Sequence, residues 1–210
     1  MSVREPLVIL DFETTGLSPD FARIIEVGAV LVEENRIVDS FSRLMNPGFY
    51  IPSFITEITG ITNKMVEDMP SPEEVMPFLQ KFIGKRQIMA HNASFDKKFL
   101  FSEMARVDLV LRNPFLCTLK LSRRLIHDSS SYSLGNLAGY LNLDTEETGQ
   151  MHRALYDVKV TFQLWKYLQN VVVRKSGLSE HDLKLYHEIS KKPKKNVDEF
   201  LENYSRDLEN

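Results

Sequence analysis

The feature that most constrains the fold is a short apolar run, Leu7–Leu10, that ends directly in an acid, Asp11. Its residues are branched and uninterrupted, which is typical of a strand buried on both faces. A strand of this kind lies in the middle of a sheet, because only a central strand is covered above and below. The run therefore predicts the central strand of a covered sheet.

The order of the segments after this run predicts an α/β domain with a mixed sheet. Two β-branched segments, 24–33 and 37–45, flank the polar pair Glu34-Asn35 and are expected to form an antiparallel hairpin. A helix is expected from Pro72 to the residue before Gly84, with Ser71 as its N-cap. The other expected elements are a strand at 87–90 and helices at 94–106, 118–126, 134–141 and 152–170.

Length and composition predict one domain with an appendage. The chain has 210 residues, 43% of them hydrophobic and 26% charged, as in folded soluble proteins. We expect a first domain at 1–170 and a charged helical extension at 171–210. The extension holds a basic run, Lys191–Lys195, followed by a mostly acidic segment. Two interpretations of the run are open, phosphate contact and a solvated, self-paired linker, and the charge pattern favours the linker.

Charge and cysteine usage exclude several classes of protein. A net charge of −3 argues against a protein that coats nucleic acid, but not against an enzyme that holds nucleic acid through metal ions. The one cysteine, Cys117, excludes an intramolecular disulfide and cysteine-based zinc sites. An acid and a proline interrupt the N-terminus, and no apolar run reaches the roughly 18 residues of a membrane span. We therefore expect a cytoplasmic protein.

Two acids follow the first predicted strand at a spacing that favours a metal site. Residues i and i+2 of a strand project from the same face, so Asp11 and Glu13 lie side by side. Two carboxylates in that position repel each other and resist desolvation unless a cation lies between them. The alternative is that one acid binds loop amides while the other is solvated.

Two further segments carry weaker signals. His91-Asn92-Ala93-Ser94-Phe95-Asp96 follows the strand at 87–90, and Ser94 or Asp96 could simply cap the next helix. The third segment is His152-Arg153-Ala154-Leu155-Tyr156-Asp157, where the helix dipole alone would favour an acid.

The spacing in the third segment decides where its histidine must lie. At about 100° per residue, His152 and Asp157 would be roughly 140° apart on one helix and could not serve one centre. If both act, His152 lies on the loop before the helix, which Gly149 would permit, and Asp157 on its first turns. A neutral histidine beside a carboxylate suits a general base.

Taken together, the four acids predict hard divalent cations, Mg²⁺ or Mn²⁺, which prefer oxygen ligands. Two such ions about 4 Å apart stabilise the attacking and leaving oxygens of a phosphodiester. The expected ligands are Asp11, Glu13, Asp96 and Asp157, with His152 taking the proton of the attacking water.

The three segments resemble the motifs of the DEDDh (DnaQ-like) family of 3′–5′ exonucleases, and the epsilon-subunit and ribonuclease T branches most of all. The resemblance covers about residues 7–168 and includes all five expected residues in order. It implies a ribonuclease H-like fold, a five-stranded mixed sheet flanked by helices. It also implies two divalent metals, single-stranded DNA or RNA 3′ ends as substrate with DNA favoured, and nucleoside 5′-monophosphates as products.

The resemblance further implies the residues that contact substrate. Leu17 would be an apolar wedge against the terminal base, and Phe95 would lie under the strand end; core packing is the alternative for such side chains. A polymerase or other protein partner is possible through 171–210, and no membrane partner is expected. The implied substrate residues are Thr14, Thr15, Gly16, Leu17, Ile58, Thr59, His91, Asn92 and Phe95.

Two other functions are open. The sequence Asp11-x-Glu13-Thr14 loosely resembles the nucleophile loop of aspartyl-phosphate phosphohydrolases, but it has Glu13 where that loop has a second aspartate and would leave His152 without a role. A non-catalytic nucleic-acid-binding or polymerase-docking module could also keep the fold. Such a module has no need of four clustered acids.

Overall fold

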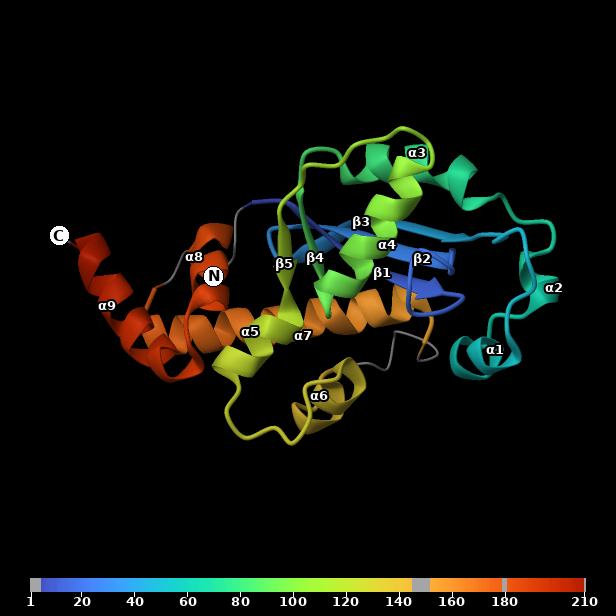
Figure 1. Ribbon diagram of the computed structural model, residues 1–210. Coiled ribbons are helices and arrows are strands. Elements are labelled where there is room, and N and C mark those ends of the chain that lie inside the picture. The colour runs from blue at the N-terminus through green and yellow to red at the C-terminus, as the bar shows by residue number, and fades with distance from the viewer. Residues whose placement is uncertain (1–4, 145–151, 179–180, 210) are drawn as a thin grey trace.

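The computed structural model describes residues 5–144, 152–178 and 181–209, and in these ranges it shows a five-stranded mixed sheet with helices on both faces (Figure 1). The strand order is β3-β2-β1-β4-β5. The strands are β1 (Leu7–Thr14), β2 (Ile24–Glu33), β3 (Arg36–Leu44), β4 (Gln87–Ala90) and β5 (Phe115–Cys117). β2 is antiparallel to β1 and β3, whereas β1, β4 and β5 are parallel. The expected ribonuclease H-like α/β fold is confirmed.

The helices divide between the two faces of the sheet. Helices α3 (Pro72–Ile83) and α4 (Ala93–Ala105) pack on one face, and α5 (Thr118–Leu125) and α7 (Ala154–Ser176) on the other. The remaining elements are α1 (Ser53–Thr59), α2 (Asn63–Val66), α6 (Leu134–Tyr140), α8 (Leu183–Lys191), the 3₁₀ turn η1 (Lys194–Asn196) and α9 (Val197–Glu209).

The alternation along β1 assigns its side chains to these two faces. Leu7 and Ile9 join the cluster on the α7 face, and Val8 and Leu10 join the cluster on the α3–α4 face. All four are buried, as expected for a central strand. Because the period is two, Asp11 continues the row that faces α7.

Several local predictions are confirmed. Ser71 caps α3 by accepting from the amide of Glu74, and the Glu74 carboxylate accepts from the amide of Ser71, which completes a capping box. The backbone of Glu34 and Asn35 has the positive φ of a tight hairpin turn. Gly84 ends α3 where expected.

Other boundaries differ from the prediction. The helix expected at 152–170 begins at Ala154 and continues beyond 170, because Val171 and Val172 are buried and Gly177 supplies the left-handed residue that ends it. Helices α1 and α2 and strand β5 were not predicted as separate elements, since seven, four and three residues carry too little periodicity. Cys117 ends β5 and is half-buried.

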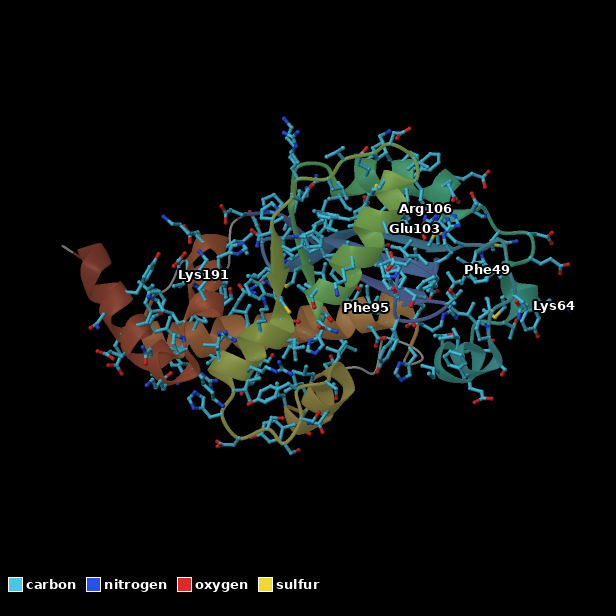
Figure 2. All side chains as sticks on the ribbon, in the orientation of Figure 1. Phe49, Lys64, Phe95, Glu103, Arg106 and Lys191 are labelled. Carbon is cyan, nitrogen blue, oxygen red and sulfur yellow. The ribbon has the colours of Figure 1, made fainter. Side chains whose placement is uncertain are left out.

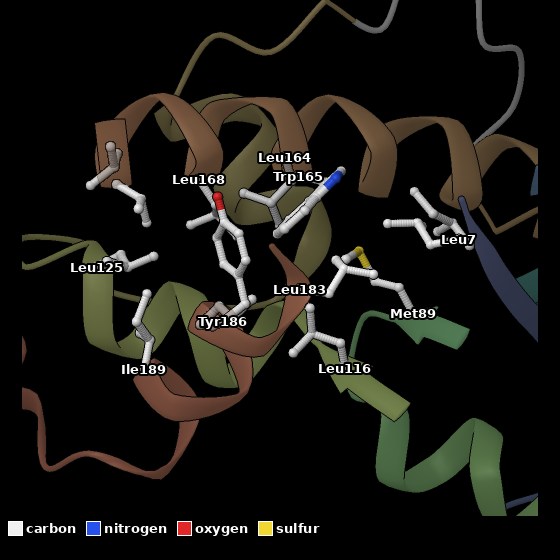
Figure 3. Packing of buried hydrophobic residues seen from close by; sticks show 14 of the residues in the cluster. Leu7, Met89, Leu116, Leu125, Leu164, Trp165, Leu168, Leu183, Tyr186 and Ile189 are labelled. Carbon is white, nitrogen blue, oxygen red and sulfur yellow. The ribbon is translucent and has the colours of Figure 1, made fainter. Parts of the chain in front are cut away.

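The segment after 170 packs on the same core as α7. The ring centres of Tyr186 on α8 and Trp165 on α7 lie 4.4 Å apart, with the rings edge to face. Both side chains are fully buried (Figure 3). Leu183, Ile189 and, from α9, Leu201 extend this cluster. The division into a first domain at 1–170 and an extension at 171–210 stays a prediction.

Among the helices of the described residues, none has the length and the apolar composition needed to cross a membrane.

Candidate active site

Three carboxylates meet at the end of β1. Asp11 and Glu13 continue the row of β1 side chains that faces α7, and Asp157 lies in the first turn of that helix. One oxygen from each of the three lies within 4.8 Å of the others. Strand alternation and a helix start thus bring two distant segments to one point.

His152 lies just outside the helix that carries Asp157. Its side chain is exposed and its backbone φ is 59°, so the chain turns there before Arg153 becomes the N-cap of α7. A rotation of about 100° per residue had required His152 to lie before the helix if it and Asp157 were to serve one centre, and His152 does lie there. Gly149, expected to permit the loop, lies outside the described residues.

Asp96 provides a fourth acid from α4. It is buried in the first turn of that helix, and the backbone amides of Asp96 and Phe12 act to lower its pKa against the larger, opposite effect of burial. The N-cap of α4 is Asn92, whose side chain makes no capping bond, so neither Ser94 nor Asp96 is the cap residue. Asp96 is outside the group of three oxygens, but its charge acts on Asp11.

Burial and mutual repulsion shift the pKa values of these acids upward. Desolvation, and then the charges of Asp96, Asp157 and Glu13, raise the pKa of Asp11 well above its usual range. Desolvation and Asp157 raise the pKa of Glu13 to about 8. Desolvation also raises the pKa of Asp96 to about 8 and that of Asp157 to about 6. Oxygen ligands whose negative charges oppose each other fit hard divalent cations.

Glu26 on β2 anchors the segment that carries His152. It is only 2% exposed and faces Glu13 across the β1–β2 pair. The guanidinium of Arg153 donates to both of its oxygens at 2.7–3.1 Å, and the amide of Ala154 donates at 2.9 Å. One buried carboxylate therefore binds both the residue after His152 and an amide at the start of α7 that has no partner within the helix.

Gly28 lets α7 approach the sheet at the same place. A Cβ at Gly28 would overlap backbone atoms of Ala154 and Leu155. Only a residue without a side chain fits there, because neither backbone segment can move aside cheaply. Glu26, Gly28 and Arg153 were not predicted as site residues, since their roles depend on contacts between segments more than 120 residues apart.

The predicted substrate residues fall into two groups. Leu17 is 89% exposed and Ile58 is 54% exposed, and Asn92 is exposed as well. These side chains are accessible to a ligand. Leu17 and Ile58 are therefore not packed in the core, which was the alternative interpretation for them.

Other predicted substrate residues form hydrogen bonds within the protein. Thr59 is 2% exposed, and its hydroxyl donates to the carbonyl of Ile55. His91 donates from Nε2 to the carbonyl of Tyr132 at 2.9 Å, and its Nδ1 lies 3.0 Å from the hydroxyl of Thr118. Burial lowers the pKa of His91 to about 4. Their assignment as substrate residues stays a prediction.

The turn after β1 and the ring of Phe95 complete the site. Thr14 and Thr15 are buried, and the Thr14 hydroxyl donates to the carbonyl of Gly16 at 2.7 Å. Phe95 is half-buried, with its ring 4.9 Å from that of Phe99 on α4. Phe95 occupies the middle of the molecule in Figure 2, on the helix that carries Asp96.

Arg23 connects the turn after β1 to helices α3 and α4 through hydrogen bonds. Its backbone amide donates to the Thr15 hydroxyl, and its guanidinium donates to Glu103 at 2.7 and 2.9 Å and to Glu73 at 2.6 Å. Glu103 is buried on α4 (Figure 2). Because this ion pair joins the loop after β1 to α4, it fixes the Asp11 segment relative to the Asp96 segment. No periodicity in the sequence indicated it.

A pocket of about 310 Å³ opens beside the carboxylates, between α6 and α7. Asp157 and Tyr156 line it on one side, and Leu134, Ala138 and Leu143 line it on the other. An acid from the carboxylate group thus borders a space that a ligand could enter.

Comparisons with known proteins find that this chain is similar to exonucleases and to DNA polymerase III proteins. A family model described as "Exonuclease" (RNase_T) matches residues 8–165. A curated relative, DNA polymerase III subunit epsilon of Aquifex aeolicus, is 35% identical over 176 residues, which are 83% of this chain and 85% of that protein. A DNA polymerase III PolC-type of Caldanaerobacter subterraneus is 40% identical over 164 residues, 78% of this chain. The match spans only 12% of that polymerase.

Solved structures are similar as well. Exonuclease X in complex with 5′ overhanging duplex DNA has a TM-score of 0.67 and 32% identity, over 88% of this chain and 99% of that chain. E. coli exonuclease I in complex with a dT13 oligonucleotide has a TM-score of 0.70 over 81% of this chain and 42% of that chain. At 17% identity, the second likeness concerns the fold alone.

Proposed function

The chain belongs to the DnaQ-like (RNase_T) exonuclease family, and from that premise we propose that it is a metal-dependent 3′–5′ exonuclease of the DEDDh type. Its substrate is the 3′ end of single-stranded nucleic acid, with DNA favoured and RNA possible. The observation that carries the proposal is that carboxylate oxygens of Asp11, Glu13 and Asp157 lie within 4.8 Å of one another. The charge of Asp96 also raises the pKa of Asp11.

The four acids hold two divalent ions, Mg²⁺ or Mn²⁺. Support comes from the donor set, which is all carboxylate, and from the raised pKa values, because charges that repel one another in a buried site become favourable once a cation lies among them. When bound, such a pair of ions stabilises the attacking and leaving oxygens of an in-line displacement.

The chain's own residues supply the proton transfer and the positioning. His152 accepts a proton from the water that attacks the terminal phosphorus, and the bond from phosphorus to the 3′ oxygen breaks, which releases a nucleoside 5′-monophosphate. The exposed position of His152 before α7 supports this role, since a general base must reach a water molecule. Leu17 and Ile58 hold the terminal nucleotide by apolar contact, which tolerates any base sequence.

The test is the direction of degradation. The full chain is incubated with a single-stranded 20-mer labelled at its 5′ end, in Mg²⁺ or in EDTA, and the products are separated on a gel. We expect a ladder that shortens from the 3′ end in Mg²⁺ only, with nucleoside 5′-monophosphates released. Asp11→Ala abolishes the ladder, whereas Asp39→Ala, an exposed acid on the edge strand β3, preserves it. Intact 20-mer in Mg²⁺ and in Mn²⁺ would reject the proposal.

A binding measurement with the same 20-mer and a search for a covalent adduct on the protein separate the alternatives. Binding of the 20-mer in EDTA without cleavage in any metal would favour a non-catalytic nucleic-acid-binding module. A stable phosphoryl adduct on Asp11 would favour the aspartyl-phosphate phosphohydrolase.

A protein partner is proposed through 171–210. The support is the similarity to polymerase III proteins. Buried side chains of α8 and α9 already pack on α7, so a partner would bind their outer surfaces. Deletion of those helices would expose this core, and surface substitutions are therefore the appropriate test.

A further inference from the structure

The basic run at 191–195 is self-paired only in part, whereas its sequence favours a self-paired linker. Lys191, labelled in Figure 2, pairs with Glu188 in the preceding helical turn, and Asp198 in the acidic segment pairs with Lys175 of α7. Among the described side chains, neither Lys192 nor Lys194 forms an ion pair. Their charges are therefore available to a ligand.

Aromatic rings and backbone contacts hold these two lysines. The Lys192 ammonium lies 4.7 Å from the centre of the Phe200 ring, and the Lys194 ammonium lies 6.0 Å from that of Tyr132. Lys194 also lies 3.4 Å from the Tyr132 hydroxyl and from the carbonyl of His127. Lys194 is thus directed onto the loop between α5 and α6.

Helix α5 adds further cations at the same place. Arg124 donates from Nε to the carbonyl of Lys192 at 3.0 Å, which joins α5 to the basic run. Lys120 and Arg123 are three residues apart on the exposed face of α5, and no acid of the described ranges pairs with them. We call Lys120, Arg123, Arg124, Lys192 and Lys194 the basic surface.

The basic surface is linked through Tyr132 to the segment that leads into the helix of Asp96. Tyr132, on which Lys194 lies, accepts the hydrogen bond of His91 through its carbonyl. His91 follows β4 and precedes the helix that carries Asp96. The charge of Arg123 also acts on His91 and contributes to its lowered pKa. One hydrogen bond therefore joins Tyr132, which Lys194 contacts, to the segment His91–Asp96.

We propose that the basic surface binds the phosphates of the nucleic-acid strand upstream of its 3′ end. This inference rests on the proposed function and adds to it a second contact region outside the site with the carboxylates. Lysine and arginine beside a tyrosine-bearing loop match a single strand, whose backbone is anionic and whose bases are unstacked. The net charge of the chain is −3, so its overall charge does not attract a nucleic-acid strand. The cations gathered in the basic surface supply that attraction locally.

Substrate length provides the test. The double variant Arg123→Ala/Lys194→Ala is compared with wild type on a single-stranded 20-mer and on a trinucleotide that has the same 3′ end. The control is Lys81→Ala/Lys85→Ala, two exposed lysines near the end of α3 on the opposite face of the sheet. We expect KM for the 20-mer to rise about 10-fold more than KM for the trinucleotide in the double variant only. The slope of log KM for the 20-mer against log salt falls by about 0.7 for each phosphate that no longer meets a cation.

The outcomes separate this inference from the proposed function. If wild type leaves both oligonucleotides intact, the proposed function fails. If wild type degrades them and the double variant matches it, or is impaired equally on both lengths, the basic surface does not bind substrate. If polyglutamate inhibits wild type but not the double variant while the 20-mer kinetics are equal, the surface binds an acidic polypeptide and the inference is overturned.

Discussion

Glu26 and Arg153 form a bidentate ion pair across 127 residues of chain, with guanidinium nitrogens 2.7–3.1 Å from the carboxylate oxygens. Arg153 is the residue between His152 and the first turn of α7. The pair therefore determines where the proposed general base lies relative to Asp157. Planar, two-point contacts of this kind fix orientation as well as distance.

Arg153→Lys is expected to lower kcat by about 10–100-fold with little change in KM, because an ammonium cannot reproduce the two-point contact that orients the segment. Steady-state kinetics on a single-stranded oligonucleotide measure both constants. Arg43→Lys, an exposed arginine on β3, serves as the matched control. Equal kcat in Arg153→Lys and wild type would show that the ion pair does not position the site.

Gly28→Ala is expected to displace the start of α7 and destabilise the fold by about 2 kcal/mol or more, because its Cβ would overlap the backbone of Ala154. The matched control is Gly139→Ala in α6, where a Cβ meets nothing within 4 Å and helix propensity predicts a small gain. Urea unfolding gives both free energies. Similar values for the two variants would contradict the close approach of α7 to β2.

In the absence of divalent ions, stability is expected to fall as pH rises from about 4 to 8. The pKa of Glu13 is raised to about 8, as is that of Asp96, so the folded state binds more protons than the unfolded state across that window. Thermal unfolding in EDTA at several pH values measures the trend. A midpoint that is constant or rises over the window would contradict the crowding of these acids.

Neutralising one acid should reverse that destabilisation. Glu13→Gln removes a carboxylate whose charged form is disfavoured, so its melting midpoint in EDTA at pH 8 is expected to exceed that of wild type by several degrees, or about 2 kcal/mol. The same variant should lack most of the stabilisation that Mg²⁺ gives to wild type. The exposed acid Asp39 provides the control, since Asp39→Asn should alter neither value.

The relative positions of some candidate site residues could be predicted, because periodicity determines their geometry. Strand alternation requires Asp11 and Glu13 to share a face, and 100° per residue requires His152 to precede the helix of Asp157. Both conclusions follow from spacing within one short segment. The structure has each of these residues at the expected kind of position.

The remainder depends on contacts that no local pattern encodes. Glu26 resembles any strand acid until its partner, 127 residues later, is in place. Thr59 and His91 match a motif, yet their polar atoms bond within the protein, because burial depends on the packing of neighbouring elements. The basic run at 191–195 looks self-neutralised in sequence, whereas the fold directs it toward α5.

The central claim is that carboxylates from β1, α4 and α7 form one site for divalent ions. Calorimetric titration of the full chain with Mn²⁺, in the presence of a nucleoside 5′-monophosphate, tests it most directly. Two ions per chain in wild type, with binding abolished in Asp11→Ala, is the predicted result. No binding to wild type, or equal binding to Asp11→Ala, would contradict it.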